Sequence, residues 1–110
     1  MGRYIIKISD EKTNKDYYME WSTIVDAPVT YGLELQEFKD YYRDEYGANE
    51  ISALDERLKR VDTKGISAHD ETLEDLLGCN RAGKKETCLT KQEILEQYCL
   101  KRMVNNFYVC

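Results

Sequence analysis

Two short segments near the N-terminus carry residues that favour β-strands, and a polar stretch separates them. Residues 3–9 (RYIIKIS) and 17–24 (YYMEWSTI) are rich in β-branched and aromatic side chains, whereas residues 10–16 (DEKTNKD) are polar or charged throughout. Side chains of this kind fit a pleated, half-buried surface. The pattern predicts a β-hairpin with a long polar loop. Because an isolated two-stranded sheet is marginal in water, we expect helices to cover one of its faces.

The rest of the chain carries helical patterns. Residues 25–32 contain the only proline and predict a connecting loop. Apolar residues then recur at helical spacing in three segments, followed by a capping-box sequence, Thr90 to Glu93. We expect the first helix to end at Gly47, and Asn49 to cap a second helix that ends near Gly65. His69 would lie at the start of a third helix that ends at Gly78 or Gly83. Thr90 would begin the last helix. These helices have the apolar sets Leu35/Phe38/Tyr42/Tyr46, Ile51/Leu54/Leu58/Val61, Leu73/Leu76/Leu77 and Ile94/Leu95/Tyr98/Met103.

These elements predict an α+β fold. The N-terminal hairpin, to which the C-terminal tail 105–110 could add a third strand, would pack against three to four short helices. A chain of 110 residues supports one modest core, so we expect a single domain, 1–110. No apolar run approaches the roughly 18 residues of a membrane span, and no signal peptide is recognisable. We therefore expect a soluble, cytoplasmic protein that does not bind membranes.

The cysteines and the single histidine do not form a recognisable catalytic or metal-binding motif. Cys79, Cys88, Cys99 and Cys110 are 9 to 11 residues apart, whereas structural zinc sites use paired ligands two to four residues apart. We expect reduced thiols, with Cys99 packed as a small apolar residue. The six glycines are isolated, so no phosphate-binding loop is present. The sequence predicts no metal, no cofactor and no enzymatic activity, and an enzyme based on His69 with Cys79 or Cys88 is the least favoured alternative.

The net charge of −5 is unevenly distributed. Residues 16–56 contain eleven acidic and two basic side chains, together with Trp21 and most of the tyrosines. Direct binding of nucleic acid would require a basic stripe, whereas an acidic, tyrosine-bearing surface suits a basic protein partner. The residues predicted to bind this partner are Tyr18, Glu34, Glu37, Asp40, Tyr41, Asp44 and Glu45, with Tyr18 and Tyr41 expected at the surface because they fall off the apolar stripes. The alternative interpretation of the acidic residues is an ordinary solvated helix face.

The stretch 18–32 (YMEWSTIVDAPVTYG), with the tyrosine- and acid-rich segment that follows it to Gly47, resembles small accessory proteins encoded by tailed bacteriophages. The resemblance carries no motif tied to an activity, so it assigns no functional residue. It implies stoichiometric binding to a host protein that handles nucleic acid or acts in defence, as anti-CRISPR proteins do. It also implies that the protein acts in the cytoplasm of the bacterial host, where the basic partner surface could be a nucleic-acid-binding channel.

A second functional class also fits the sequence. Arg57, Lys59, Arg60 and Lys64 lie close together and could supply phosphate contacts to a small nucleotide signal that the protein sequesters. A solvated helix face explains the same four residues.

Overall fold

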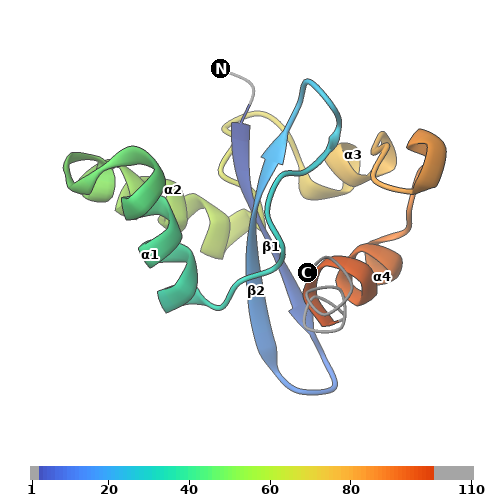
Figure 1. Ribbon diagram of the computed structural model, residues 1–110, viewed down its shortest axis with the longest axis horizontal. Coiled ribbons are helices and arrows are strands. Elements are labelled where there is room, and N and C mark those ends of the chain that lie inside the picture. The colour runs from blue at the N-terminus through green and yellow to red at the C-terminus, as the bar shows by residue number, and fades with distance from the viewer. Residues whose placement is uncertain (1–2, 101–110) are drawn as a thin grey trace.

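An antiparallel sheet lies at the centre of the computed structural model, which describes residues 3–100 (Figure 1). Strands β1 (Arg3–Asp10) and β2 (Lys15–Ser22) pair along their whole length, from Arg3 opposite Ser22 to Asp10 opposite Lys15. The predicted hairpin is confirmed, and its loop is shorter than predicted because both ends of the polar stretch join the strands. Within the turn, the Asp10 carboxylate accepts hydrogen bonds from the Lys12 amide and the Thr13 hydroxyl, which closes the loop locally.

Short segments from elsewhere in the chain occupy both edges of the hairpin. Strand β3 (Ala27–Pro28) pairs with the end of β2, inside the segment predicted as a loop. On the other edge, the Lys7 amide donates to the Gly65 carbonyl at 2.9 Å. The third strand of the described sheet is therefore β3. The predicted strand at 105–110 lies outside the described residues.

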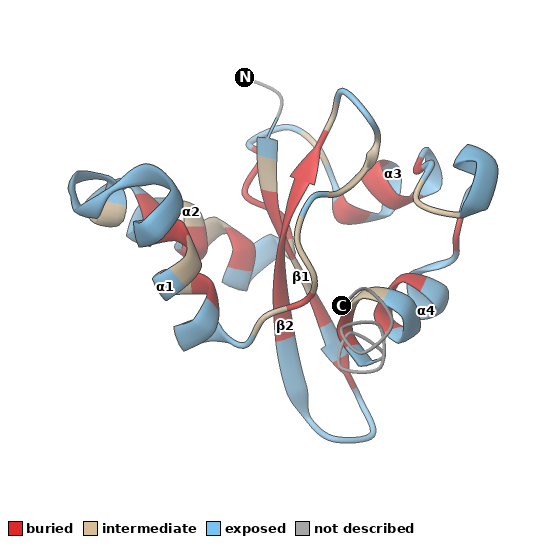
Figure 2. Ribbon diagram, viewed as in Figure 1, coloured by how far each residue is buried: buried red, intermediate tan, exposed pale blue. Residues whose placement is uncertain are grey.

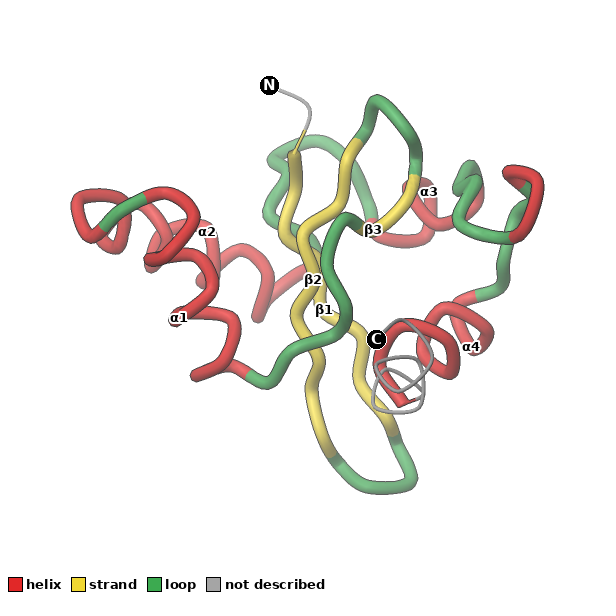
Figure 3. The backbone as a smooth tube through the Cα atoms, viewed as in Figure 1, coloured by secondary structure: helices red, strands yellow, loops and turns green. Residues whose placement is uncertain are grey.

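Helices pack on both faces of the sheet, and not on one face as the sequence suggested. Helices α1 (Leu35–Tyr46) and α2 (Ile51–Lys64) lie on one side of the hairpin, and α3 (Leu73–Gly78), α4 (Lys91–Ile94) and its π-helical continuation η3 (Leu95–Leu100) lie on the other (Figures 1 and 3). The reason is that both faces of the hairpin carry buried apolar side chains. One face has Ile6, Ile8, Tyr17, Met19 and Trp21, and the other has Ile5 and Tyr18. The strands are accordingly buried through their central part (Figure 2).

Each side of the sheet has its own apolar cluster. The cluster under α1 and α2 comprises Ile5, Tyr18, Phe38, Tyr42, Leu54, Leu58 and Val61. The cluster under α3 and α4 contains, among others, Ile6, Ile8, Met19, Trp21, Ile66, Leu76, Ile94 and Cys99. The α+β fold, with the hairpin between short helices, is as predicted.

Most helix boundaries follow the predicted glycines and caps. Gly47 ends α1 at φ +92° and Gly65 ends α2 at φ +84°, conformations that carry no steric penalty for glycine. Thr90 and Glu93 form the predicted capping box of α4. Asn49, however, does not cap the second helix: it lies inside a 3₁₀ turn, η1 (Ala48–Glu50), that leads directly into α2. A second 3₁₀ turn, η2 (Lys84–Glu86), lies between α3 and α4. No helix within residues 3–100 is long and apolar enough to cross a membrane.

Candidate protein-binding face

The acidic side chains of α1 lie on its solvent side. We call this set the acidic face, and it comprises Glu34, Glu37, Asp40, Asp44 and Glu45, all of which are exposed. Phe38 and Tyr42, in the middle of the apolar stripe, are buried against the sheet. The Glu37 carboxylate accepts a hydrogen bond from the Glu34 amide at 3.2 Å, so part of the acidic face also caps the helix.

The charge of the acidic face is partly compensated at its N-terminal end. Lys15 of β2 lies 3.9 Å from Glu34, and Arg43 lies 2.8 Å from Asp40. Asp44 and Glu45 form no ion pair with any residue between 3 and 100. The negative potential of α1 is therefore greatest toward its C-terminal end.

This position is unfavourable for the helix itself. The C-terminal end of a helix carries a partial negative charge, so acidic side chains in the last turn destabilise it and basic ones stabilise it. Asp44 and Glu45 immediately precede the last residue of α1, Tyr46. A requirement for helix stability alone would favour the opposite charge there, and departures of this kind are typical of functional surfaces.

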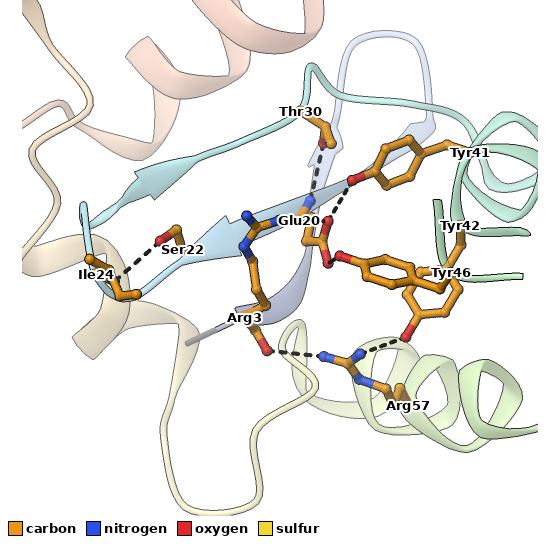
Figure 4. Close-up of polar contacts among 9 residues, drawn as sticks. All are labelled: Arg3, Glu20, Ser22, Ile24, Thr30, Tyr41, Tyr42, Tyr46 and Arg57. Carbon is orange, nitrogen blue, oxygen red and sulfur yellow. Dashed lines mark hydrogen bonds and ion pairs between the residues drawn. The ribbon is translucent and has the colours of Figure 1, made fainter. Parts of the chain in front are cut away.

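A buried carboxylate fixes α1 to the sheet (Figure 4). Glu20 of β2 is 1% exposed, and its carboxylate accepts hydrogen bonds from the hydroxyls of Tyr41 and Tyr46, each at 2.5 Å. The guanidinium of Arg3 lies 3.3 Å from the same carboxylate. A buried charge needs this kind of full pairing. Both ends of the C-terminal half of α1 are thus held by one side chain of the sheet.

The same contacts change how the tyrosines titrate. Burial, followed by the hydrogen bond to Glu20, raises the pKa of Tyr46 to about 12 and that of Tyr41 further above its usual range. Both hydroxyls therefore remain protonated donors at neutral pH. Tyr41 lies at the foot of the acidic face, half-buried, with its ring against Phe38.

Tyr18 does not belong to the surface, and its prediction as an exposed partner-binding residue is wrong. It is 4% exposed, packs in the cluster under α1 and α2, and donates its hydroxyl to Asp62 of α2 at 2.9 Å. Burial, with this hydrogen bond, raises its pKa well above the usual range. The prediction was wrong because α1 and α2 cover the face of β2 that the sequence left without a partner.

The four basic residues of α2 are divided between structural contacts and solvent. Arg57 donates to the Tyr42 hydroxyl at 2.8 Å and to the Arg3 carbonyl at 3.0 Å. Arg60 and Lys64 donate to carbonyl groups of residues 67–69, each at 2.7 Å. Lys59 is exposed, and its side chain has no hydrogen-bond or ion-pair partner within the described part of the chain.

The residues considered for catalysis are not brought together. His69 is exposed and precedes α3, which begins after the N-cap Thr72 and not at His69 as expected. Cys79 and Cys88 are exposed free thiols, and Cys99 is buried in an apolar cluster as predicted. Among residues 3–100, no group of three or more His, Cys, Asp or Glu side chains could hold a metal ion. Cys110 lies outside the described residues.

Sequence reasoning missed the role of Glu20 and Arg3. The signal that could have found Glu20 is its position, since it follows Tyr18 on the same strand face and lies opposite Ile5. The tertiary contact with α1 could not be found in the same way, because Tyr41 and Tyr46 are more than 20 residues away. The chain matches no protein-family model, no curated protein and no solved structure.

Proposed function

We propose that this protein is a non-enzymatic binding protein that uses the acidic face of α1 to bind a basic surface of another protein. The observation that carries the proposal is the pair Asp44 and Glu45, which is exposed, has no ion-pair partner between residues 3 and 100, and lies where it destabilises its own helix. An uncompensated acidic patch attracts a basic partner over long distances and accelerates association with it.

The support beneath the acidic face favours binding without rearrangement. Phe38 and Tyr42 bury α1 against the sheet, and Glu20 holds Tyr41 and Tyr46. A surface already fixed in its bound conformation loses little entropy on association. The partner-binding set is accordingly Glu34, Glu37, Asp40, Asp44 and Glu45, with Tyr41 beneath them, and Tyr18 is removed from it.

The class of partner follows from charge and from the phage resemblance. The protein is a phage-encoded inhibitor or modulator that binds, in the host cytoplasm, a host protein handling nucleic acid or acting in defence. A basic channel that normally binds nucleic acid has the charge that the acidic face complements. The chain's net charge of −5 disfavours direct binding of nucleic acid by the protein itself.

Charge reversal tests this proposal. The triple variant Asp40→Lys, Asp44→Lys, Glu45→Lys leaves the capping residue Glu37 and the buried tyrosines unchanged. We expect it to lose partners that the unaltered protein captures from host lysate at low salt. The matched control reverses three exposed acids elsewhere, Glu11, Glu74 and Glu96, and should keep capture.

Two results would reject the acidic face as the binding surface. One is equal capture by the α1 variant and the unaltered protein. The other is a captured partner whose retention does not change between low and high salt, because exposed charge pairs are screened by salt.

A further inference from the structure

Two surface depressions share the side chains of Arg3 and Arg57 and so lie side by side. The first lies between β1, α2 and the segment that follows α2, and the second between β1, β2, α1 and α2. The first has a volume of about 410 Å³ and is further lined by Arg60, His69, Asp70 and Glu71. The second has a volume of about 380 Å³ and is further lined by Glu20, Tyr42, Tyr46, Glu50 and Ala53. Each volume lies within the range of small-molecule sites.

The first depression offers free donors for an anion. Arg60 uses its Nε to donate to the Ser67 carbonyl at 2.7 Å, which fixes the plane of the guanidinium. Its two Nη atoms have no hydrogen-bond partner among residues 3–100, and the ring of His69 is likewise without one there. A guanidinium held by one nitrogen and open at the other two suits a phosphate group, which it can bind with two hydrogen bonds.

The second depression offers an aromatic wall. The rings of Tyr42 and Tyr46 lie 4.5 Å apart between centroids, and Tyr46 is 40% exposed. Arg57 lies 6.0 Å from the centre of the Tyr42 ring and donates to its hydroxyl, so one guanidinium belongs to both depressions. A flat heterocycle stacks on tyrosine, and Arg57 adds a planar cation beside it.

We propose that the two depressions form one binding site for a nucleoside monophosphate, with the phosphate at Arg60 and His69 and the base against Tyr46. Asp70 and Glu71 line the same depression as Arg60, and a carboxylate can accept hydrogen bonds from ribose hydroxyls. The site differs from the one expected from sequence, because Lys59 and Lys64 line neither depression, whereas Arg3 and His69 line the first. It does not depend on the acidic face of α1, so either proposal can fail without the other.

The test measures dissociation constants of the full chain by calorimetry for three probes: inorganic phosphate, ribose 5-phosphate and adenosine 5′-monophosphate. We expect the nucleotide to bind about tenfold more tightly than ribose 5-phosphate, because stacking of a base contributes on this scale. Arg60→Gln should weaken nucleotide binding about tenfold, as loss of a charge-assisted contact does. The matched control, Lys59→Gln, removes the same charge one residue away and should change binding less than about twofold.

A second pair of variants separates stacking from folding. Tyr46→Ala should reduce nucleotide affinity to that of ribose 5-phosphate while leaving the affinity for ribose 5-phosphate unchanged, which also shows that the variant is folded. Tyr46→Phe keeps the ring and should keep the preference for the nucleotide.

Three results would overturn the proposal. They are no binding of the nucleotide at about 1 mM, equal affinity for all three probes, and equal effects of the Arg60 and Lys59 variants. Tighter binding of a short oligoadenylate than of the mononucleotide would also overturn it, because a strand would then be the ligand.

Discussion

Removing the Tyr41 hydroxyl tests whether Glu20 holds α1 on the sheet. In Tyr41→Phe the ring still packs on Phe38, but the buried carboxylate loses a donor that lies 2.5 Å away. Hydrogen bonds to charged groups contribute about 1.5 to 3 kcal/mol, and Glu20 is too deeply buried for water to replace the donor freely. We expect the free energy of unfolding to fall by about 2 kcal/mol, a substantial part of the 5 to 15 kcal/mol typical of a domain.

Urea unfolding followed by the fluorescence of Trp21 measures this change. Trp21 is the only tryptophan and is fully buried in the cluster on the opposite side of the sheet, so its signal reports global unfolding. Tyr17→Phe is the matched control, because the Tyr17 hydroxyl has no hydrogen-bond partner within the described chain. It should change stability by less than about 0.5 kcal/mol.

A double-mutant cycle sharpens the test. Tyr46→Phe alone should cost less than Tyr41→Phe, because Tyr46 is 40% exposed and water can replace its hydroxyl. The double variant should lose more than the sum of the two, by about 0.5 kcal/mol or more, since it leaves the carboxylate with Arg3 alone. If Tyr41→Phe is no more destabilising than Tyr17→Phe, Glu20 does not hold α1 on the sheet. The same conclusion follows if the stability losses of Tyr41→Phe and Tyr46→Phe simply add in the double variant.

Two further predictions concern pH and the backbone. The pKa of Tyr46 is raised from 10.0 to about 12 in the folded protein, so its contribution to stability is fully present below pH 10 and is lost as the pH rises from about 10 to about 12. Urea midpoints across this range should therefore fall less steeply for Tyr46→Phe than for the unaltered chain, and parallel curves would contradict the assignment. Gly65→Ala should lower stability by about 1 to 2 kcal/mol, because Gly65 has φ +84° and an added Cβ would lie 3.1 Å from Leu73 Cδ2. Gly78→Ala, where a Cβ meets nothing within 4 Å, should be neutral or slightly stabilising in the same urea-unfolding assay. Equal losses in both variants would show that the conformation of Gly65 is not the cause.

The distribution of charge changes between sequence and structure. Residues 16–56 form an acidic block along the chain, but basic residues from other segments pair with several of its members. Arg3 pairs with Glu20, Lys15 with Glu34, and Arg81 with Asp26. Asp44 and Glu45 of α1 remain exposed and without an ion pair among residues 3–100, and so do Glu50, Asp55 and Glu56 in η1 and α2. Within α1, the unpaired acids at its C-terminal end are Asp44 and Glu45.

Elements whose signals are local can be predicted from the amino-acid sequence. The alternation of Tyr4, Ile6 and Ile8 on one face predicts a strand. Gly47 and Gly65 end helices because glycine adopts their backbone conformation freely, and Thr90 with Glu93 starts α4. Each of these depends on residues within a few positions of one another, so the chain's own periodicity reveals it.

Long-range packing determines which faces of the hairpin are covered and which side chains meet. Tyr18 was expected at the surface because nothing local shows that α1 and α2 return to cover its strand face. The same long-range packing brings Tyr41 and Tyr46 to Glu20, and Arg3 to Arg57 and Arg60. These contacts join residues 21 to 57 positions apart, and periodicity along the chain carries no information at that separation. The candidate sites therefore depend on how the helices pack against the two faces of the hairpin, which each element's own sequence does not specify.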